Sequence, residues 1–133
     1  MKKLTEPIVT NFVITWLSNN RYQNIKTKAP KEHGVDIQAN TGYRRYLYIE
    51  CKGEAKNASI KESNFRTAIG QIATRMDKSE YQSYALAFPE SYYSLVIRRI
   101  PYQFAKRNKL FILLINSKGQ IKKITWKELK NNQ

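Results

Sequence analysis

Residues 34–53, GVDIQANTGYRRYLYIECKG, contain two short segments in which apolar and polar residues alternate. In residues 35–40 the apolar set is Val35, Ile37 and Ala39, and in residues 46–52 it is Leu47, Ile49 and Cys51. Period-two alternation is typical of a strand with one buried face. Residues 41–45 contain Gly42 and can reverse the chain between the segments. The stretch therefore predicts a hairpin of two antiparallel strands.

The polar face of this hairpin carries a chemical pattern that packing alone does not require. Asp36 and Glu50 are expected on the same face, with Lys52 two residues beyond Glu50. Two carboxylates suit Mg²⁺, which takes one or two protein carboxylates together with phosphate oxygens, and an ammonium suits a phosphate. The alternative is that Asp36 is an ordinary hairpin carboxylate and that Glu50 and Lys52 belong to a solvated strand face.

The length and charge of the chain limit the classes of protein to which it can belong. The 133 residues fit one domain, expected over residues 1–133. The 24 Lys and Arg against 10 Asp and Glu give a formal charge of +14, which favours polyanionic partners. A membrane surface is the rival, but no apolar run approaches the roughly 18 residues of a spanning helix. One cysteine and one histidine exclude a disulfide framework and Cys-based or His-rich metal sites. Without a secretory signal at MKKLTEPIV, we expect a soluble, cytoplasmic protein with no membrane contact.

Helical and strand patterns alternate along the rest of the chain. Apolar stripes at helical spacing predict helices over residues 5–19 and 62–78, the second preceded by a polar connector at 54–62. Further strands are expected at 22–28, 82–88 and 109–115, with an edge strand at 121–126 before a basic tail. Residues 92–108 are expected to be helical and interrupted at Pro101. This order predicts an α/β fold with a mixed central sheet flanked by helices.

The motif on the hairpin resembles that of a known group of enzymes. Gly34-Val35-Asp36 on one strand and Ile49-Glu50-Cys51-Lys52 on the next, between two helices, resemble the PD-(D/E)XK nuclease superfamily with its restriction endonuclease-like core. The resemblance covers roughly residues 5–88. Residues 65–77, FRTAIGQIATRMD, and the strand ending in Ala87-Phe88-Pro89-Glu90 are also similar to the endonuclease-like excision controlling factors of cyanobacterial DNA elements.

This resemblance implies a set of site residues. Asp36, Glu50 and the backbone carbonyl of Cys51 would hold Mg²⁺, with Mn²⁺ as a substitute, and Lys52 would assist the attacking water. Gln71 matches a glutamine that often reaches the site from the second helix, although Arg75 stands where the superfamily usually has tyrosine. Glu6 is either an acid of the site or, as we favour, a partner of the helix dipole. His33 is either a phosphate contact or a surface histidine.

Basic residues around the hairpin are candidates for nucleic-acid contacts, since lysine and arginine neutralise phosphates. The set comprises Arg44, Arg45, Lys56, Arg66 and Arg75, with Tyr43, Tyr46 and Tyr48 between them. A second basic group is expected on a separate face and comprises Arg98, Arg99, Lys106, Arg107 and Lys109.

The sequence leaves two leading functional hypotheses and, more remotely, a basic structural protein with no site at all. The first is a Mg²⁺-dependent endodeoxyribonuclease that hydrolyses phosphodiester bonds in DNA, either as a homodimer with two sites or with protein partners that supply target recognition. The second is a non-catalytic DNA-binding accessory factor for excision or recombination on the same fold. Carboxylates that face a polyanion favour the enzyme, because a pure binding protein has no use for them.

Overall fold

The computed structural model of the chain describes residues 3–28, 34–77 and 81–133. Its centre is one six-stranded sheet whose strand order follows the sequence. The strands are β1 (Gln23–Thr27), β2 (Ile37–Gly42), β3 (Arg45–Cys51), β4 (Gln82–Pro89), β5 (Leu110–Ile115) and β6 (Ile121–Ile124). The pairs β3–β4 and β4–β5 are parallel and the others antiparallel, so the expected mixed sheet is confirmed.

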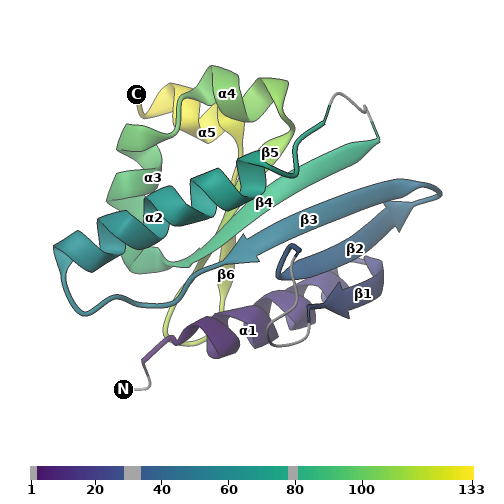
Figure 1. Cartoon of the computed structure of the whole chain (residues 1–133), viewed down its shortest axis with the longest axis horizontal. Coiled ribbons are helices and arrows are strands. Elements are labelled where there is room, and N and C mark those ends of the chain that lie inside the picture. Colours follow the sequence, from purple (N-terminus) through teal and green to yellow (C-terminus); the bar gives the residue numbers. More distant parts are fainter. Residues whose placement is uncertain (1–2, 29–33, 78–80) are drawn as a thin grey trace.

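Helices cover both faces of the sheet (Figure 1). They are α1 (Glu6–Asn19), α2 (Ala58–Ala73), the 3₁₀ turn η1 (Glu90–Tyr92), α3 (Tyr93–Arg99), α4 (Tyr102–Arg107) and α5 (Trp126–Asn131). Helix α1 packs on one face, against apolar residues of β2 to β5. Helices α2 to α5 share the opposite face, where their apolar residues pack on β4, β5 and β6. We call these the α1 face and the α2 face.

Helix α1 begins where its sequence predicts. The Thr5 hydroxyl accepts a hydrogen bond from the Ile8 amide at 3.5 Å, and Pro7 lies in the first turn, where its missing N–H costs nothing. Val9, Val13 and Leu17 are fully buried at helical spacing. The helix therefore presents one apolar stripe to the sheet.

The prediction of residues 62–78 for the second helix was wrong at both ends, because α2 spans Ala58–Ala73. Its start lies inside the expected polar connector, since the side chain of Asn57 accepts from the Ile60 amide at 2.9 Å and caps the helix. The expected stripe is present, with Phe65, Ala68 and Ile72 buried. A local cap signal thus moved the boundary without changing the buried face.

The hairpin turn is tighter than expected. Gly42 and Arg45 pair across it, which leaves only Tyr43 and Arg44 as the loop, and Arg44 takes a left-handed φ of 58°. Of the two loop residues only Arg44 is left-handed, and the strand pairing shifts register between Asn40 and Gly42, so a bulge accompanies the tight turn. Asp36 lies just before β2 and Lys52 just after β3, whereas the sequence placed both within strands.

In the C-terminal region the predicted interruption at Pro101 is confirmed, whereas the chain after β6 differs from the prediction. The helical pattern at 92–108 divides into α3 and α4 on either side of Ile100 and Pro101. The expected edge strand ends at Ile124, and the expected basic tail forms α5. This short helix buries Leu129 and packs Trp126 on the core of the α2 face. Two apolar residues among lysines were too weak a pattern to predict it.

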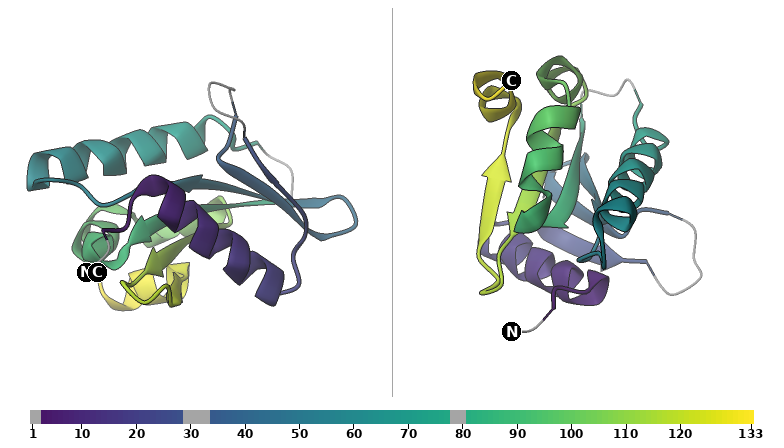
Figure 2. Two further views of the ribbon diagram at one scale, coloured as in Figure 1. Left: turned by 90° about the horizontal axis from the view of Figure 1, so that it is seen from below. Right: turned by 90° about the vertical axis from the view of Figure 1, so that its left-hand side faces the viewer.

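The β2–β3 hairpin projects beyond the helices at one end of the molecule (Figures 1 and 2). Along the part of the chain that the structure describes, no helix combines the length and apolarity needed to cross a bilayer.

Candidate active site

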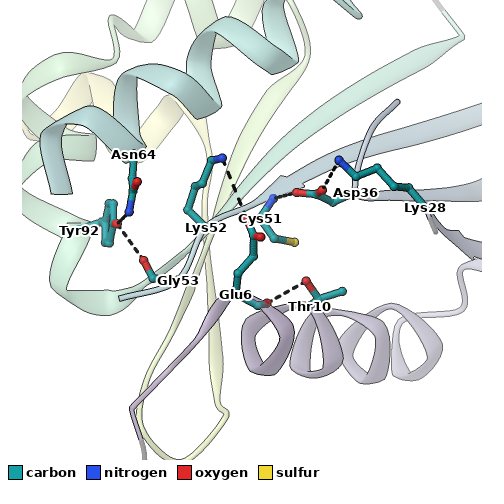
Figure 3. A network of polar contacts seen from close by, with 9 residues as sticks. All are labelled: Glu6, Thr10, Lys28, Asp36, Cys51, Lys52, Gly53, Asn64 and Tyr92. Atoms are coloured by element: carbon teal, nitrogen blue, oxygen red, sulfur yellow. Dashed lines mark hydrogen bonds and ion pairs between the residues drawn. The ribbon is translucent and has the colours of Figure 1, made fainter. Parts of the chain in front are cut away.

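The carboxylate of Asp36 is held between the two neighbouring strands. Its backbone carbonyl accepts a hydrogen bond from the Lys28 amide at 3.2 Å, beyond the end of β1. Its side-chain Oδ2 accepts from the Cys51 amide at 2.8 Å, in β3 (Figure 3). Asp36 therefore replaces a backbone link of the sheet with a side-chain link, which fixes the direction of its carboxylate.

Glu50 is the one polar or charged residue among those described that is buried, with 2% of its surface exposed. Burial first, then the negative charge of Asp36 and a hydrogen bond with it, raise the pKa of the Glu50 carboxyl to about 8. Lys28 and Lys52 oppose this shift. The two predicted carboxylates thus lie in contact, and near neutral pH the Glu50 carboxyl is mostly protonated.

Lys52 and Glu6 form the second part of the cluster. The Lys52 Nζ lies 4.0 Å from Glu6 Oε1 at the first turn of α1 (Figure 3). Burial and the charge of Asp36 raise the pKa of the Glu6 carboxyl, and Lys52 and Lys28 counteract part of that rise. Glu6 therefore lies within the electrostatic reach of the site and is more than a partner of the helix dipole.

Gly53 makes this arrangement possible. The Glu54 amide donates to the Leu4 carbonyl at 2.7 Å, so the chain after β3 runs against the start of α1. A Cβ on Gly53 would lie 2.7 Å from the carbonyl carbon of Thr5 and would also overlap the amide of Glu6. Only glycine permits this close approach, which brings Glu6 to Lys52.

Lys28 is a residue of the site that the sequence did not identify. Its Nζ lies 3.5 Å from Asp36 Oδ1, and both residues line a cleft of about 440 Å³ between α1 and the end of β1. Glu6, Thr10 and Thr27 also line this cleft. The available signal was a lysine at the end of the strand expected to precede the hairpin, but pairing of the strands was needed to place it opposite Asp36.

The side chain of Cys51 takes no part in this polar chemistry. Its thiol is fully buried, and burial raises the pKa of the thiol far above its usual value. Its backbone amide orients Asp36, as described above. The predicted use of its carbonyl as a metal ligand stays a prediction.

The two carboxylates of Asp36 and Glu50 suit a hard cation that needs few ligands from the protein. Within residues 3–28, 34–77 and 81–133, no group of three or more His, Cys, Asp or Glu side chains could hold a metal. Mg²⁺ needs fewer, since it keeps several waters and takes one or two carboxylates. Asp36 and Glu50 provide that number, and they lie side by side at a site where burial and the charge of Asp36 raise the pKa of the Glu50 carboxyl. The residues therefore fit Mg²⁺ and do not fit a site built from protein ligands alone.

The remaining predicted residues lie on different surfaces. Arg44 forms the exposed hairpin turn beside Arg45, and Lys56 is exposed in the connection to α2. Gln71 is exposed on α2, and Arg75 is exposed just beyond its end. Arg66 lines a groove with Arg99 and Phe104, on the flank of α2 opposite to that of Gln71. No hydrogen bond or ion pair joins any of these six described residues to the carboxylate pair, and His33 lies outside the described residues.

Comparison with known proteins supports the fold. No family model and no curated protein matches the chain. Of the solved structures, an XisH family protein from Nostoc punctiforme is 21% identical with a TM-score of 0.57, over 88% of this chain and 98% of that one. An fdxN element excision controlling factor protein from Anabaena variabilis is 23% identical with a TM-score of 0.58, over 90% and 99%.

The likeness therefore extends over nearly the whole of both neighbours, and at these identities it concerns the fold alone. It agrees with the expected similarity to excision controlling factors of cyanobacterial DNA elements. Membership of the PD-(D/E)XK superfamily stays a prediction.

Proposed function

We propose that this protein is a Mg²⁺-dependent nuclease that hydrolyses phosphodiester bonds in DNA. The observation that carries the proposal is the Asp36–Glu50 carboxylate pair, buried in part and surrounded by Lys28, Lys52 and Glu6. A structural role would be served better by apolar residues, because burying two like charges side by side is costly.

Asp36 and Glu50 would hold the cation, which supplies charge neutralisation at the phosphate and a water of lowered pKa. The protein's own residues do the positioning. The Cys51 amide fixes the Asp36 carboxylate, and Glu6 holds the Lys52 ammonium at the edge of the pair. Lys52 then stabilises negative charge that develops on the phosphate oxygens, and Lys28 offers a second cation in the cleft.

DNA is the proposed substrate because of charge and likeness. The formal charge of +14 favours polyanions. The neighbour from Anabaena variabilis is described as an excision controlling factor of the fdxN element, which supports a role on DNA. Protein partners or a second copy of the chain would supply target recognition.

The same likeness favours a second candidate, a non-catalytic accessory factor for excision or recombination that binds DNA. The two candidates differ in what the carboxylate pair does. In the enzyme it holds Mg²⁺ and supports turnover, whereas in the accessory factor it has no partner and weakens the attraction for phosphate.

Calorimetric titration with Mg²⁺ and cleavage of duplex, single-stranded and branched DNA separate these candidates. Asp36→Asn is the sharpest variant, because its amide oxygen still accepts from the Cys51 amide while the charge is lost. Glu90→Gln is the matched control, since it removes an exposed carboxylate outside the cluster.

For the enzyme we expect Asp36→Asn to lose Mg²⁺ binding and to cleave more than about a hundredfold more slowly, exceeding the loss from an outer-shell partner of a metal. Glu90→Gln should cleave like the wild type. If the wild type binds DNA but cuts none of the substrates with Mg²⁺ or Mn²⁺, the accessory factor is the correct reading.

A further inference from the structure

We propose that the open polar face of β1, β2 and β3 binds an unpaired strand of nucleic acid and leads it to the carboxylate pair. The inference rests on the proposed function in one respect, the cleavage of the bound strand at the carboxylate pair. It concerns a surface that lies outside the cluster itself, on the α2 face of the sheet, where the hairpin extends beyond the helices (Figure 1).

The strand register arranges polar side chains into three rows across this face. Asn40 pairs with Gln23 on one side and with Tyr46 on the other, and these three form the row nearest the hairpin tip. The middle row has Gln38 between Lys26 and Tyr48. The last row has Asp36, bonded to Lys28 through its carbonyl and in contact with Glu50. The path therefore ends at the candidate active site.

Residues of the row nearest the tip and of the middle row line a hollow suited to nucleotides. It has a volume of about 690 Å³, and its lining includes Gln23, Lys26, Gln38, Asn40, Arg44 and Tyr46. None of the lining residues is acidic. The side-chain amides of Gln23 and Gln38, both among the described residues, make no hydrogen bond within the protein. Such amides can pair with base edges, and the cations can neutralise phosphates.

The spacing of the rows favours an extended strand over a duplex. Successive rows are two residues apart along β2, which is about 6.7 Å. That is twice the rise of roughly 3.4 Å per nucleotide in a stacked strand. One nucleotide per row therefore requires a strand pulled out of its stack, as in single-stranded regions, where each base is accessible to a side chain.

Aromatic residues provide the stacking surfaces that such a strand needs. Tyr43 at the hairpin tip is 84% exposed, and the Arg44 guanidinium lies 5.1 Å from the centre of its ring. Tyr46 stacks on Tyr48 at 6.3 Å, and Tyr48 stacks on Tyr84 at 5.9 Å. The ladder of rings holds Tyr46 rigidly at the edge of the hollow, so little side-chain freedom is lost on binding.

Binding by the full-length Asp36→Asn chain in EDTA tests the path without cleavage. Fluorescence anisotropy compares a labelled single-stranded oligonucleotide with the duplex of the same sequence. Tyr43→Ala and Lys26→Gln change the path, and Lys127→Gln is the control, because it removes the same charge from α5, which follows β6 at the opposite edge of the sheet.

We expect the single strand to bind at least about tenfold more tightly than the duplex. Tyr43→Ala should weaken it about fivefold or more, as for loss of one stacked base. Lys26→Gln should lower the salt slope by about 0.7, the value for one phosphate of a single strand. Lys127→Gln should leave both quantities unchanged.

Equal or tighter binding of the duplex, or equal effects of Lys26→Gln and Lys127→Gln, would overturn the inference. Those results would leave the proposed function standing if the wild type still cleaves duplex DNA with Mg²⁺. Conversely, a wild type that never cleaves but prefers the single strand through Tyr43 and Lys26 would refute the nuclease and support the binding path.

Discussion

The two halves of the sheet differ in how their α2 face is covered. In β4 and β5 nearly every residue is buried, because α2 to α5 pack over one face and α1 over the other. In β2 and β3 burial alternates, so that Ile37, Ala39 and Leu47 are buried on the α1 face while Gln38 and Asn40 are not. The candidate site lies at the boundary between these two halves. Glu50 is on β3, in the half with the open face, and is itself buried.

Cations of both halves have partners, with aromatic rings and the carboxylates of Glu62 and Glu128 in the covered half, and mainly carboxylates near the site. In the covered half, lysines lie over aromatic rings, with the Lys106 Nζ 4.5 Å from the centre of Trp126 and the Lys123 Nζ 4.4 Å from that of Phe111. Near the site, Lys28 and Lys52 lie beside carboxylates. The excess positive charge is therefore spread over more than one surface. The second basic group, which runs from Arg98 to Lys109, belongs to the covered half.

The largest expected effect is on the covered half. Ile72→Ala should lower the free energy of unfolding by about 2–5 kcal/mol, because Ile72 is fully buried on the side of α2 that faces the core. Ile60→Ala on the same helix should change it by less than about 0.5 kcal/mol, since Ile60 is 41% exposed. Urea unfolding measures the free energy for both variants. Similar values for the two would contradict the packing of α2 with Ile72 inside and Ile60 outside.

The junction between the halves should be sensitive at Gly53. Gly53→Ala should destabilise the fold by about 1–3 kcal/mol, because the new methyl group meets the backbone of Thr5 and Glu6. Gly70→Ala is the matched control and should be neutral or stabilising by up to about 1 kcal/mol, since nothing lies within 4 Å of the added carbon in the α2 helix. Thermal unfolding compares them, and a stabilising Gly53→Ala would refute the close approach of α1.

Glu50 should produce a pH dependence at the boundary. Its pKa is raised from 4.5 to about 8 on folding, so between these values the folded state holds more protons than the unfolded state. Stability should therefore fall as pH rises through this window, by on the order of 2 kcal/mol, and level off above it. Urea unfolding across the window should show a smaller fall for Glu50→Gln.

Mg²⁺ offers an additional check of the same group. It should stabilise the wild type more above pH 8 than near pH 6, because protons and metal compete for the same carboxylates. Parallel pH profiles for the wild type and Glu50→Gln would show that Glu50 does not titrate in this window.

The smallest expected effect separates two arginines that the sequence grouped together. Arg44 lies at the open hairpin tip, whereas Arg66 lies in the groove between α2 and α4. Arg44→Ala should reduce the salt slope of nucleic-acid binding by about 0.7 to 0.9. Arg66→Ala should leave the slope unchanged, and a larger effect of Arg66→Ala would move the binding path to the covered half.

Much of the site could be predicted because alternation along a strand is a local property. The apolar residues Ile37, Leu47 and Ile49 had to face the core, and the period of two then placed Asp36 and Glu50 on the other side together. The same reasoning identified the buried β5 strand and the stripe of α2. Element ends such as that at Asn57 were missed, because a cap depends on one side chain and leaves no periodic signal.

By itself, the sequence determined the mixed sheet, the hairpin and the pair of carboxylates on one face, all of which follow from short-range periodicity. Only the tertiary structure decided which cations and acids surround that pair. Lys28 reaches Asp36 through pairing of β1 with β2, and Glu6 reaches Lys52 because α1 packs against Gly53. These contacts join residues far apart in the chain, and long-range packing leaves no pattern in the spacing of the residues that it brings together.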